Sequence, residues 1–122
     1  MCEKITSVTI IMPTFNEAGN IADLIHESVR SVHDAGIENI EILVVDDDSA
    51  DHTWEIASNM TCEPATVRVI RRMSEHGLTK SLREGISQAK HDVVVWLDCD
   101  FSHPPQRIPQ LLYMLEQGFD IA

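Results

Sequence analysis

Short runs of β-branched residues alternate with longer stretches of helical periodicity along this chain, and that alternation constrains the fold most strongly. The apolar runs that predict strands cover residues 8–12, 40–45, 67–70 and 93–97. The stretches that predict helices begin after Asn20, near residue 51 and after Gly77, with a last one around residues 108–115. Strands that alternate with helices are typical of βαβ units, because parallel strands need a crossover connection. The sequence therefore predicts an α/β fold with a mostly parallel sheet.

The first predicted helix has clear signals at both ends. Asn20 can cap it together with Asp23 three residues later, and Gly36 ends it. Its apolar residues recur at helical spacing: Ile21, Leu24, Ile25, Val29 and Val32. We expect an amphipathic helix that faces the core.

Later segments carry weaker signals. The second helix is expected over residues 51–60, and the third, over 78–89, has Leu82, Ile86 and Ala89 on one side. The run 93–97 is apolar throughout, which predicts a fully buried strand.

The last residues predict that the polypeptide continues beyond residue 122. Gly118 caps the last predicted helix, and residues 119–122 read as the start of a fifth strand. A strand cut this short is an unusual terminus. We expect residues 1–122 to be the N-terminal part of a longer polypeptide.

Charge excludes one class of partner. The 122 residues contain 9 Lys and Arg against 20 Asp and Glu, a formal net charge of -11. A negatively charged protein repels the negative phosphate backbone of a nucleic acid, so nucleic acid is not an expected partner.

The cysteines and the apolar runs bear on location. Cys2, Cys62 and Cys99 are odd in number and lack CxxC spacing, and no long apolar run follows the start of the chain. The longest apolar run, 93–97, is far shorter than the roughly 20 residues that span a bilayer. These features predict a reducing, cytoplasmic location and no transmembrane helix within the chain.

Acidic and other unusual residues follow three of the predicted strands. They occupy residues 13–17, 46–49 and 98–100. Ligands of open parallel sheets bind outside the carboxyl ends of the strands, so these segments are expected to meet there. Carboxylates gathered at one edge repel each other unless a cation or hydrogen bonds compensate. Asp98 and Asp100 point the same way in an extended segment and can share Mg²⁺ or Mn²⁺ with a substrate phosphate.

Each of these segments also has a simpler interpretation. The Asp98-Cys99-Asp100 motif can merely cap a turn. Ser49 or Asp51 can cap the next helix, or one carboxylate of the aspartate triplet can bind a nucleobase edge or a ribose hydroxyl. Residues 13–17 are either a plain turn or a loop that meets a base.

The basic residues and the histidines leave alternatives open. Arg68, Arg71 and Arg72 form either a surface at a strand edge or a cluster that faces a phosphate. Lys80 and Arg83, in the helix after Gly77, can face the ligand. The six histidines follow no zinc-ligand spacing.

Five motifs occur in order along the chain. They are Ile-Met-Pro-Thr-Phe-Asn-Glu at 11–17, Val-Val-Asp-Asp-Asp-Ser at 44–49, Val-Ile-Arg-Arg at 69–72, Gly-Leu at 77–78 and Leu-Asp-Cys-Asp-Phe-Ser-His-Pro-Pro at 97–105. Together they resemble the family 2 glycosyltransferases, most closely the dolichyl-phosphate mannose synthase group. The resemblance implies the GT-A fold, a Rossmann-like three-layer α/β/α arrangement. It also implies that residues 1–122 are the nucleotide-sugar-binding part, without the acceptor-binding part.

The resemblance further implies an activity. A hexose, preferably mannose from GDP-mannose, would be transferred to a polyprenyl (dolichyl) phosphate, with inversion at the anomeric carbon. The reaction would take place at the cytoplasmic face of a membrane and would use Mg²⁺ or Mn²⁺. UDP-glucose or another donor is the alternative within the family. The acceptor phosphate is already an anion, so a strong general base is not needed. We expect residues 1–122 alone to be inactive in transfer.

Site residues carried over by position fall into two groups. Pro13, Phe15, Glu17, Val45 and Asp47 would surround the nucleotide, and Asp98, Cys99 and Asp100 would lie along the diphosphate. Asp98 and Asp100 would serve catalysis and, with Ser102, hold the metal. The chain departs from the family pattern at Ala50 and His52, where Pro and Gly are frequent, and at Cys99 and Lys80.

Two other classes fit less well. A phosphohydrolase that uses Asp98 and Asp100 would need further acids and a lysine downstream, and little chain follows Asp100. A non-catalytic acidic α/β module that binds a nucleotide or metal, such as a phosphoacceptor receiver domain, would place its acidic pair after the first strand.

Overall fold

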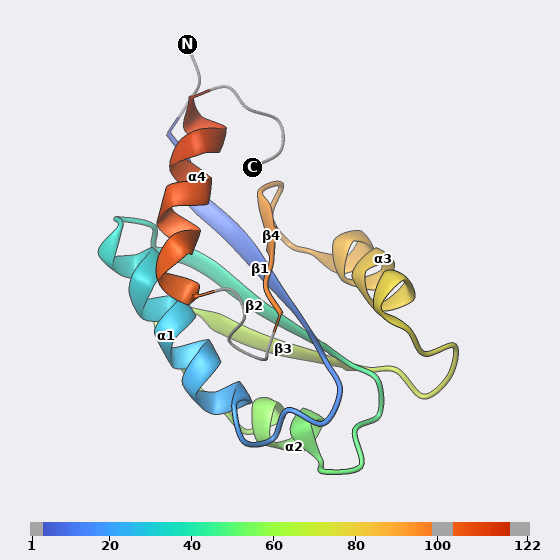
Figure 1. Ribbon diagram of the computed structural model, residues 1–122. Coiled ribbons are helices and arrows are strands. Elements are labelled where there is room, and N and C mark those ends of the chain that lie inside the picture. Colours follow the sequence, from blue (N-terminus) through green and yellow to red (C-terminus); the bar gives the residue numbers. More distant parts are fainter. Residues whose placement is uncertain (1–3, 99–103, 118–122) are drawn as a thin grey trace.

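The computed structural model describes residues 4–98 and 104–117 and contains one parallel sheet (Figure 1). Its strands are β1 (Ser7–Thr14), β2 (Asn39–Asp46), β3 (Thr66–Arg71) and β4 (Val94–Trp96). Their order is β3-β2-β1-β4, and every neighbouring pair is parallel. The predicted α/β class with a mostly parallel sheet is confirmed.

Helices cover both faces of this sheet. Helices α1 (Ile21–Asp34), α2 (Thr53–Ser58) and α4 (Ile108–Glu116), the last preceded by a 3₁₀ turn at Pro105–Arg107, lie on one face, and α3 (Leu78–Gln88) lies on the other (Figure 1). The predicted three layers are therefore confirmed. In the described part of the chain, no helix is both long and apolar enough to cross a membrane.

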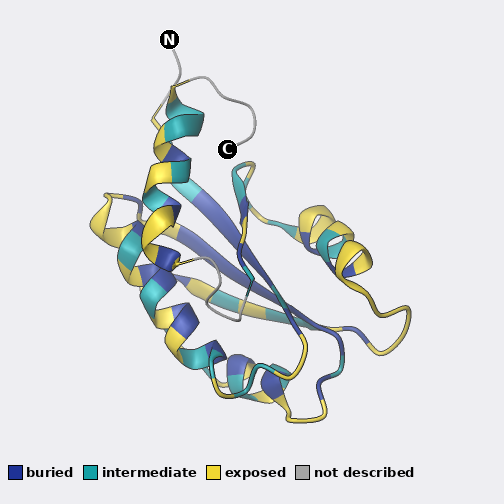
Figure 2. Ribbon diagram, in the orientation of Figure 1, coloured by how far each residue is buried: buried dark blue, intermediate teal, exposed yellow. Residues whose placement is uncertain are grey.

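The two faces of the sheet bury different side chains because successive strand residues point in opposite directions. On the α1 face, Ile10 and Ile42 join a core that extends to Leu24 of α1 and Ile108 of α4. On the α3 face the core is smaller and centres on Ile11, Leu43 and Val45. The central strands β1 and β2 are buried on both sides, as Figure 2 shows, whereas β3 and β4 are at the edges.

Helix α3 packs on the sheet through its smallest residues. A Cβ added to Gly85 would lie 2.9 Å from Cγ2 of Ile11 and 3.3 Å from Cγ2 of Val45, so any larger residue would force these side chains to shift. Ser81 and Gly85 are the buried residues of α3, and Ile86 is 61% exposed. The face indicated by Leu82, Ile86 and Ala89 is therefore not the one that α3 buries most deeply.

Two other expectations need correction or stay open. Strand β4 is three residues long and lies at the sheet edge, with Trp96 48% exposed, so the predicted full burial of residues 93–97 is wrong within the described chain. Gly118 and the predicted fifth strand at 119–122 lie outside the described residues.

An ion pair between the buried Glu41 and the partly exposed Arg68 fastens α3 at the amino end of the sheet. Glu41 accepts hydrogen bonds from the Thr9 hydroxyl and the Lys90 N–H, both at 2.9 Å, and its second carboxylate oxygen lies 3.3 Å from Arg68. Arg68 also donates to the Gln88 carbonyl at 2.6 Å. These contacts connect β1, β2 and β3 with the end of α3.

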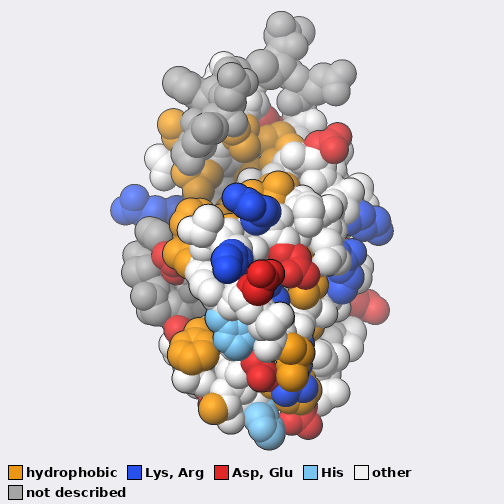
Figure 3. Space-filling view, turned by 90° about the vertical axis from the view of Figure 1, so that its right-hand side faces the viewer, with side chains coloured by type: hydrophobic (Ala, Val, Ile, Leu, Met, Phe, Trp, Pro, Cys, Tyr) orange, Lys and Arg blue, Asp and Glu red, His pale blue; other side chains and the backbone are white. Residues whose placement is uncertain are grey.

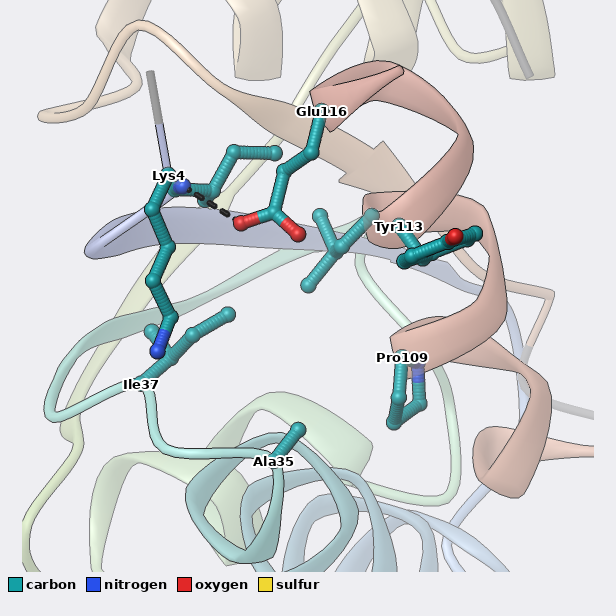
Figure 4. A pocket seen from close by; sticks show the side chains of 8 residues that line it. Lys4, Ala35, Ile37, Pro109, Tyr113 and Glu116 are labelled. Carbon is teal, nitrogen blue, oxygen red and sulfur yellow. Dashed lines mark hydrogen bonds between the residues drawn. The ribbon is translucent and has the colours of Figure 1, made fainter. Parts of the chain in front are cut away.

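Helix α4 is joined to the same end of the molecule. The Ile5 N–H donates to the Glu116 carboxylate at 2.7 Å, beside a hollow of about 180 Å³ bordered by Lys4, Ile37 and Tyr113 (Figure 4). This hollow lies at the amino ends of β1 and β2, so it is remote from the segments that the sequence singles out.

Candidate functional site

The carboxyl ends of the strands form one rim. Thr14 of β1 pairs with Asp46 of β2, which pairs with Arg71 of β3, and on the other side Ile11 pairs with Trp96 of β4. Residues 15–17, 47–49 and Asp98 therefore leave the sheet at the same end. Strands β2 and β4 are separated by β1 alone, which corresponds to roughly 10 Å at the usual strand spacing.

Asp46 is a structural residue of this rim. It is fully buried, and its carboxylate accepts hydrogen bonds from the Thr14 hydroxyl at 2.6 Å and from the Ser49 hydroxyl and N–H at 2.6 and 2.8 Å. The side chain points toward the α1 face, as alternation from Ile42 and Val44 requires. Asp46 thus joins the end of β1 to the turn after β2.

The loop after β1 is held by the segment that follows β2. The Asn16 N–H donates to the Ser49 hydroxyl at 2.8 Å, and the Glu17 N–H donates to the Thr53 hydroxyl at 3.0 Å. Asn16 has φ 56°, a left-handed conformation that Asn tolerates. These bonds leave the Phe15 side chain 62% exposed at the rim.

Asp51 closes the same network. Slight burial acts to raise the pKa of Asp51, but hydrogen bonds from the Thr53 hydroxyl and from the Ala18 and Thr53 N–H groups outweigh it. The pKa of Asp51 is therefore lowered from its ordinary 3.8. This fits the sequence alternative in which Asp51 stabilises the start of the next helix.

Asp47 points to the opposite face, toward α3. Its Oδ2 accepts a hydrogen bond from the Gly77 N–H at 2.8 Å, and its Oδ1 accepts one from the Ser81 hydroxyl at 2.8 Å and a longer one from Arg72 at 3.4 Å. A carboxylate offers about four acceptor positions, so one remains, on Oδ2. Asp47 can accept one more hydrogen bond from a ligand.

Asp48 belongs to a third environment. It has φ 53°, and its carboxylate lies 2.6 Å from Arg71, whose guanidinium stacks 3.9 Å above the centre of the Trp54 ring. His52 also has a left-handed backbone, φ 61°, at a position where the resemblance leads one to expect glycine. The turn is thus kept in shape by an ion pair and a cation–π contact.

The three arginines of the basic cluster do not form a single patch. Arg68 pairs with Glu41, Arg71 with Asp48, and Arg72 with Asp47 and Glu84. Each guanidinium is therefore paired with protein carboxylates, two of them for Arg72, which does not favour the alternative of a single cluster that faces a phosphate.

Lys80 and Arg83 lie on the outer side of α3. Both are exposed and border a polar hollow of about 500 Å³ with Glu75 and Glu84. The α3 side of the molecule mixes basic and acidic side chains (Figure 3). This mixture does not single out an anion site.

The remaining predicted site residues are partly described. Asp98 follows β4 at the rim, is half-buried, and accepts a hydrogen bond from the Trp96 indole N–H at 3.2 Å. Pro13 is also half-buried, whereas Val45 is fully buried under α3 and can shape the site only from beneath. Cys99, Asp100 and Ser102 lie outside the described residues.

The donor set suits a hard divalent cation. Carboxylate and hydroxyl oxygens, as in Asp98, Asp100 and Ser102, are the ligands that Mg²⁺ and Mn²⁺ prefer. Across residues 4–98 and 104–117, no three His, Cys, Asp or Glu side chains come together as a metal-binding group. Because Asp100 and Ser102 lie outside the described residues, the predicted metal centre stays a prediction.

Sequence reasoning missed Thr14 and Ser81 as partners of the aspartates, and Glu84 as the partner of Arg72. Thr14 carried a signal, because it directly precedes the loop and pairs with Asp46 in register. Ser81 and Glu84 reach Asp47 and Arg72 only through the packing of α3.

Residues 9–122 match the family model described as "Glycosyl transferase family 2". The chain is 42% identical over 115 residues to a "Dolichol-phosphate mannosyltransferase" of Pyrococcus furiosus, covering 94% of this chain and 32% of that protein. Its namesake from Mycosarcoma maydis is 34% identical over 112 residues, with 89% and 38% covered.

A second kind of relative has another sugar in its name. An "Undecaprenyl-phosphate 4-deoxy-4-formamido-L-arabinose transferase" of Proteus mirabilis is 30% identical over 123 residues, covering 98% of this chain and 37% of that protein. A solved structure described as "Crystal Structure of a Mycobacterial Protein" superposes with a TM-score of 0.69 at 22% identity, covering 93% of this chain and 38% of that one. The chain spans about a third of the length of the curated relatives it matches.

Proposed function

Because the chain belongs to glycosyltransferase family 2, we propose that its rim binds the donor, a nucleotide sugar, for transfer to a polyprenyl phosphate. The observation that carries the proposal is the free acceptor position of Asp47 at the same rim as Asp98. Asp47 can bind the base of a nucleotide, and Asp98 can bind near its diphosphate.

The base of the nucleotide belongs at the Asp47 end. Asp47 offers Oδ2 to one N–H of a base, while Gly77, Ser81 and Arg72 hold its other acceptor positions. The exposed ring of Phe15 is available for stacking on a base. Pro13 and Glu17 complete this end, with Val45 buried beneath it.

The diphosphate belongs at the Asp98 end. Asp98, Asp100 and Ser102 would hold Mg²⁺ or Mn²⁺ there, and Cys99 would contribute backbone contact. When bound, the cation offsets the negative charge that develops on the leaving diphosphate. In a nucleotide the ribose lies between the base and the phosphates. In the same way, β1 lies between the strands that carry Asp47 and Asp98 at their ends, so one nucleotide can reach both carboxylates.

The reaction that we propose needs little proton transfer. An oxygen of the acceptor phosphate attacks the anomeric carbon, the bond from that carbon to the diphosphate oxygen breaks, and the nucleoside diphosphate leaves. The configuration at the anomeric carbon is inverted. Because the attacking phosphate is already an anion, no general base is assigned to this chain.

The names of the relatives guide the choice of substrates. Dolichol-phosphate and undecaprenyl-phosphate in those names favour a polyprenyl phosphate acceptor. We propose that the reaction takes place at a membrane surface, on its cytoplasmic side. The mannosyltransferase at 42% identity favours GDP-mannose as donor. We assign residues 1–122 to donor binding and expect them to bind without transferring.

Titration calorimetry tests this proposal. GDP-mannose, UDP-glucose and GDP are each titrated, with and without Mn²⁺, into the wild-type chain and into Asp100→Ala. We expect Mn²⁺-dependent binding, strongest for the guanine nucleotides, that Asp100→Ala abolishes. The control is Asp92→Ala, which removes an exposed aspartate at the opposite end of β4 and should bind like wild type.

Other outcomes would change the assignment. Stronger binding of UDP-glucose would keep the family function and replace the donor. Equal, weak and metal-independent binding of all three compounds would contradict the proposal and favour a non-catalytic module. Rapid sugar transfer by the purified chain would contradict the division between donor and acceptor parts.

A further inference from the structure

The turn between β3 and α3 is built around one buried arginine. The Arg72 side chain is 8% exposed and donates to the Glu84 carboxylate and the Glu75 carbonyl, both at 3.0 Å. It reaches Asp47 Oδ1 and the Ser81 hydroxyl at 3.4 Å. Its backbone is engaged as well, since its N–H donates to the Asp46 carbonyl at 2.7 Å.

Asp47 depends on this arrangement for both charge and position. Its carboxylate is largely buried, and a buried carboxylate without a positive partner is strongly disfavoured. The guanidinium of Arg72 supplies that partner. It also anchors the turn that brings the Gly77 N–H and the Ser81 hydroxyl to Asp47.

We infer that Arg72 is a positioning residue for nucleotide recognition, which acts by holding the Asp47 carboxylate so that its remaining acceptor position, on Oδ2, is available to a nucleotide. This inference rests on the proposed function of the rim. In this role Arg72 itself need not touch the nucleotide: its Nε serves Glu84, and its Nη1 serves Asp47, Ser81 and the Glu75 carbonyl.

Lysine should not replace arginine here. The Nε of Arg72 serves Glu84 while Nη1 serves Asp47, so the two carboxylates are bridged by different nitrogens of one rigid plane. A lysine ammonium is a single point of charge and cannot keep both contacts in this geometry.

The matched control is another arginine paired with a buried carboxylate. Arg68 pairs with Glu41 at the amino end of the sheet, away from the rim. Arg68→Gln removes an arginine–carboxylate pair and should lower thermal stability. It should leave nucleotide affinity unchanged.

The experiment is a double-mutant cycle on GDP affinity. Wild type, Arg72→Gln, Asp47→Asn, the double variant and Arg68→Gln are titrated with GDP and Mn²⁺, at a temperature where circular dichroism shows each to be folded. Arg72→Gln should weaken GDP binding about tenfold, the effect of one misplaced hydrogen bond to a charged group. If Arg72 acts through Asp47, the double variant should bind no more weakly than Asp47→Asn.

Each result decides the inference. Wild-type affinity in Arg72→Gln, or losses that add in the double variant, would overturn it while leaving the proposed function intact. A wild-type chain that binds no nucleotide would remove the proposed function and the inference together. If Arg72→Gln does not fold, Arg72→Lys takes its place, with the same weakening expected and wild-type affinity overturning the inference.

Discussion

Replacing Asp46 should destabilise the chain by an amount that depends on what replaces it. The carboxylate is fully buried, with the Thr14 and Ser49 hydroxyls on Oδ1 and the Ser49 N–H on Oδ2. Asp46→Ala removes the acceptor for all three donors. Asp46→Asn keeps the shape but exchanges one oxygen for an amide nitrogen.

The three donors differ in how well they can adapt. The Ser49 N–H is fixed by the backbone, and a buried donor left without an acceptor costs about 1–3 kcal/mol. The hydroxyls can rotate toward other acceptors and lose less. With a hydrogen bond to a charged group worth about 1.5–3 kcal/mol, we expect Asp46→Ala to lower the free energy of unfolding by roughly 3 kcal/mol.

Asparagine can satisfy most of the network. Its oxygen, placed at Oδ2, accepts from the Ser49 N–H, and its NH₂ group, placed at Oδ1, donates to the Thr14 hydroxyl oxygen. The variant also avoids burying a charge, which offsets part of the loss. We expect Asp46→Asn to lower the free energy of unfolding by about 1 kcal/mol.

Urea unfolding followed by far-ultraviolet circular dichroism measures both values. The m-value should stay constant, so that midpoint shifts report stability. The reasoning fails if the two variants lose the same stability, or if Asp46→Ala stays within about 0.5 kcal/mol of wild type, the range of ordinary surface substitutions.

Three further substitutions test other parts of the fold by the same unfolding assay. Gly85→Ala should destabilise by about 1 kcal/mol, because overpacking against Ile11 costs about 1–3 kcal/mol and exceeds the gain in helix propensity; a more stable variant would contradict the close packing of α3. Glu41→Gln should cost roughly 1–2 kcal/mol, since its amide would face Arg68, and an unchanged midpoint would show that this pair is dispensable. Asp51→Asn should destabilise at pH 7, and the difference from wild type should shrink as the pH falls below 3.8, because the lowered pKa of Asp51 adds stability only while the carboxylate is ionised; a pH-independent difference would contradict this.

The sheet was predictable because its signals are local. Strands β1 and β2 are mostly apolar, as expected of parallel strands buried on both faces, with Thr9 and Glu41 as polar exceptions away from the strand ends. The edge position of β4 was not predictable from its composition. An apolar run of five residues has the same composition whether the strand pairs with other strands on both sides or on one side only. The sequence therefore did not indicate that Trp96 is exposed.

Helix α3 shows where periodicity misleads. Helical spacing draws attention to Leu82 and Ile86, yet the helix approaches the sheet at Gly85, where there is no side chain to keep it away. A small residue in a helix either lowers the stability of the helix or marks a place where the helix packs closely on its neighbour. Only the side chains opposite it, here Ile11 and Val45, decide between them.

The aspartate triplet shows what sequence can and cannot resolve at a site. Alternation along β2 sends Asp46 to the α1 face and Asp47 to the α3 face, which the pattern of the preceding residues contains. The left-handed backbone of Asp48 and the arrival of Ser81 and Arg72 at Asp47 are not in that pattern. They depend on turns and packing fixed far along the chain.

The hydrogen-bond and ion-pair partners of these aspartates also limit which residues can be expected to need a metal ion. Carboxylates gathered at a rim need compensation, but Asp46 has three hydrogen-bond donors, Asp47 has Arg72 and Asp48 has Arg71. The triplet is therefore compensated by the protein itself, and the argument for a cation passes to Asp98 and Asp100. Neutralising Asp47 should then weaken nucleotide binding without removing its dependence on Mn²⁺, whereas Asp100→Ala should remove that dependence. If Asp47→Asn abolished the response to Mn²⁺, the two ends of the site would not be separate.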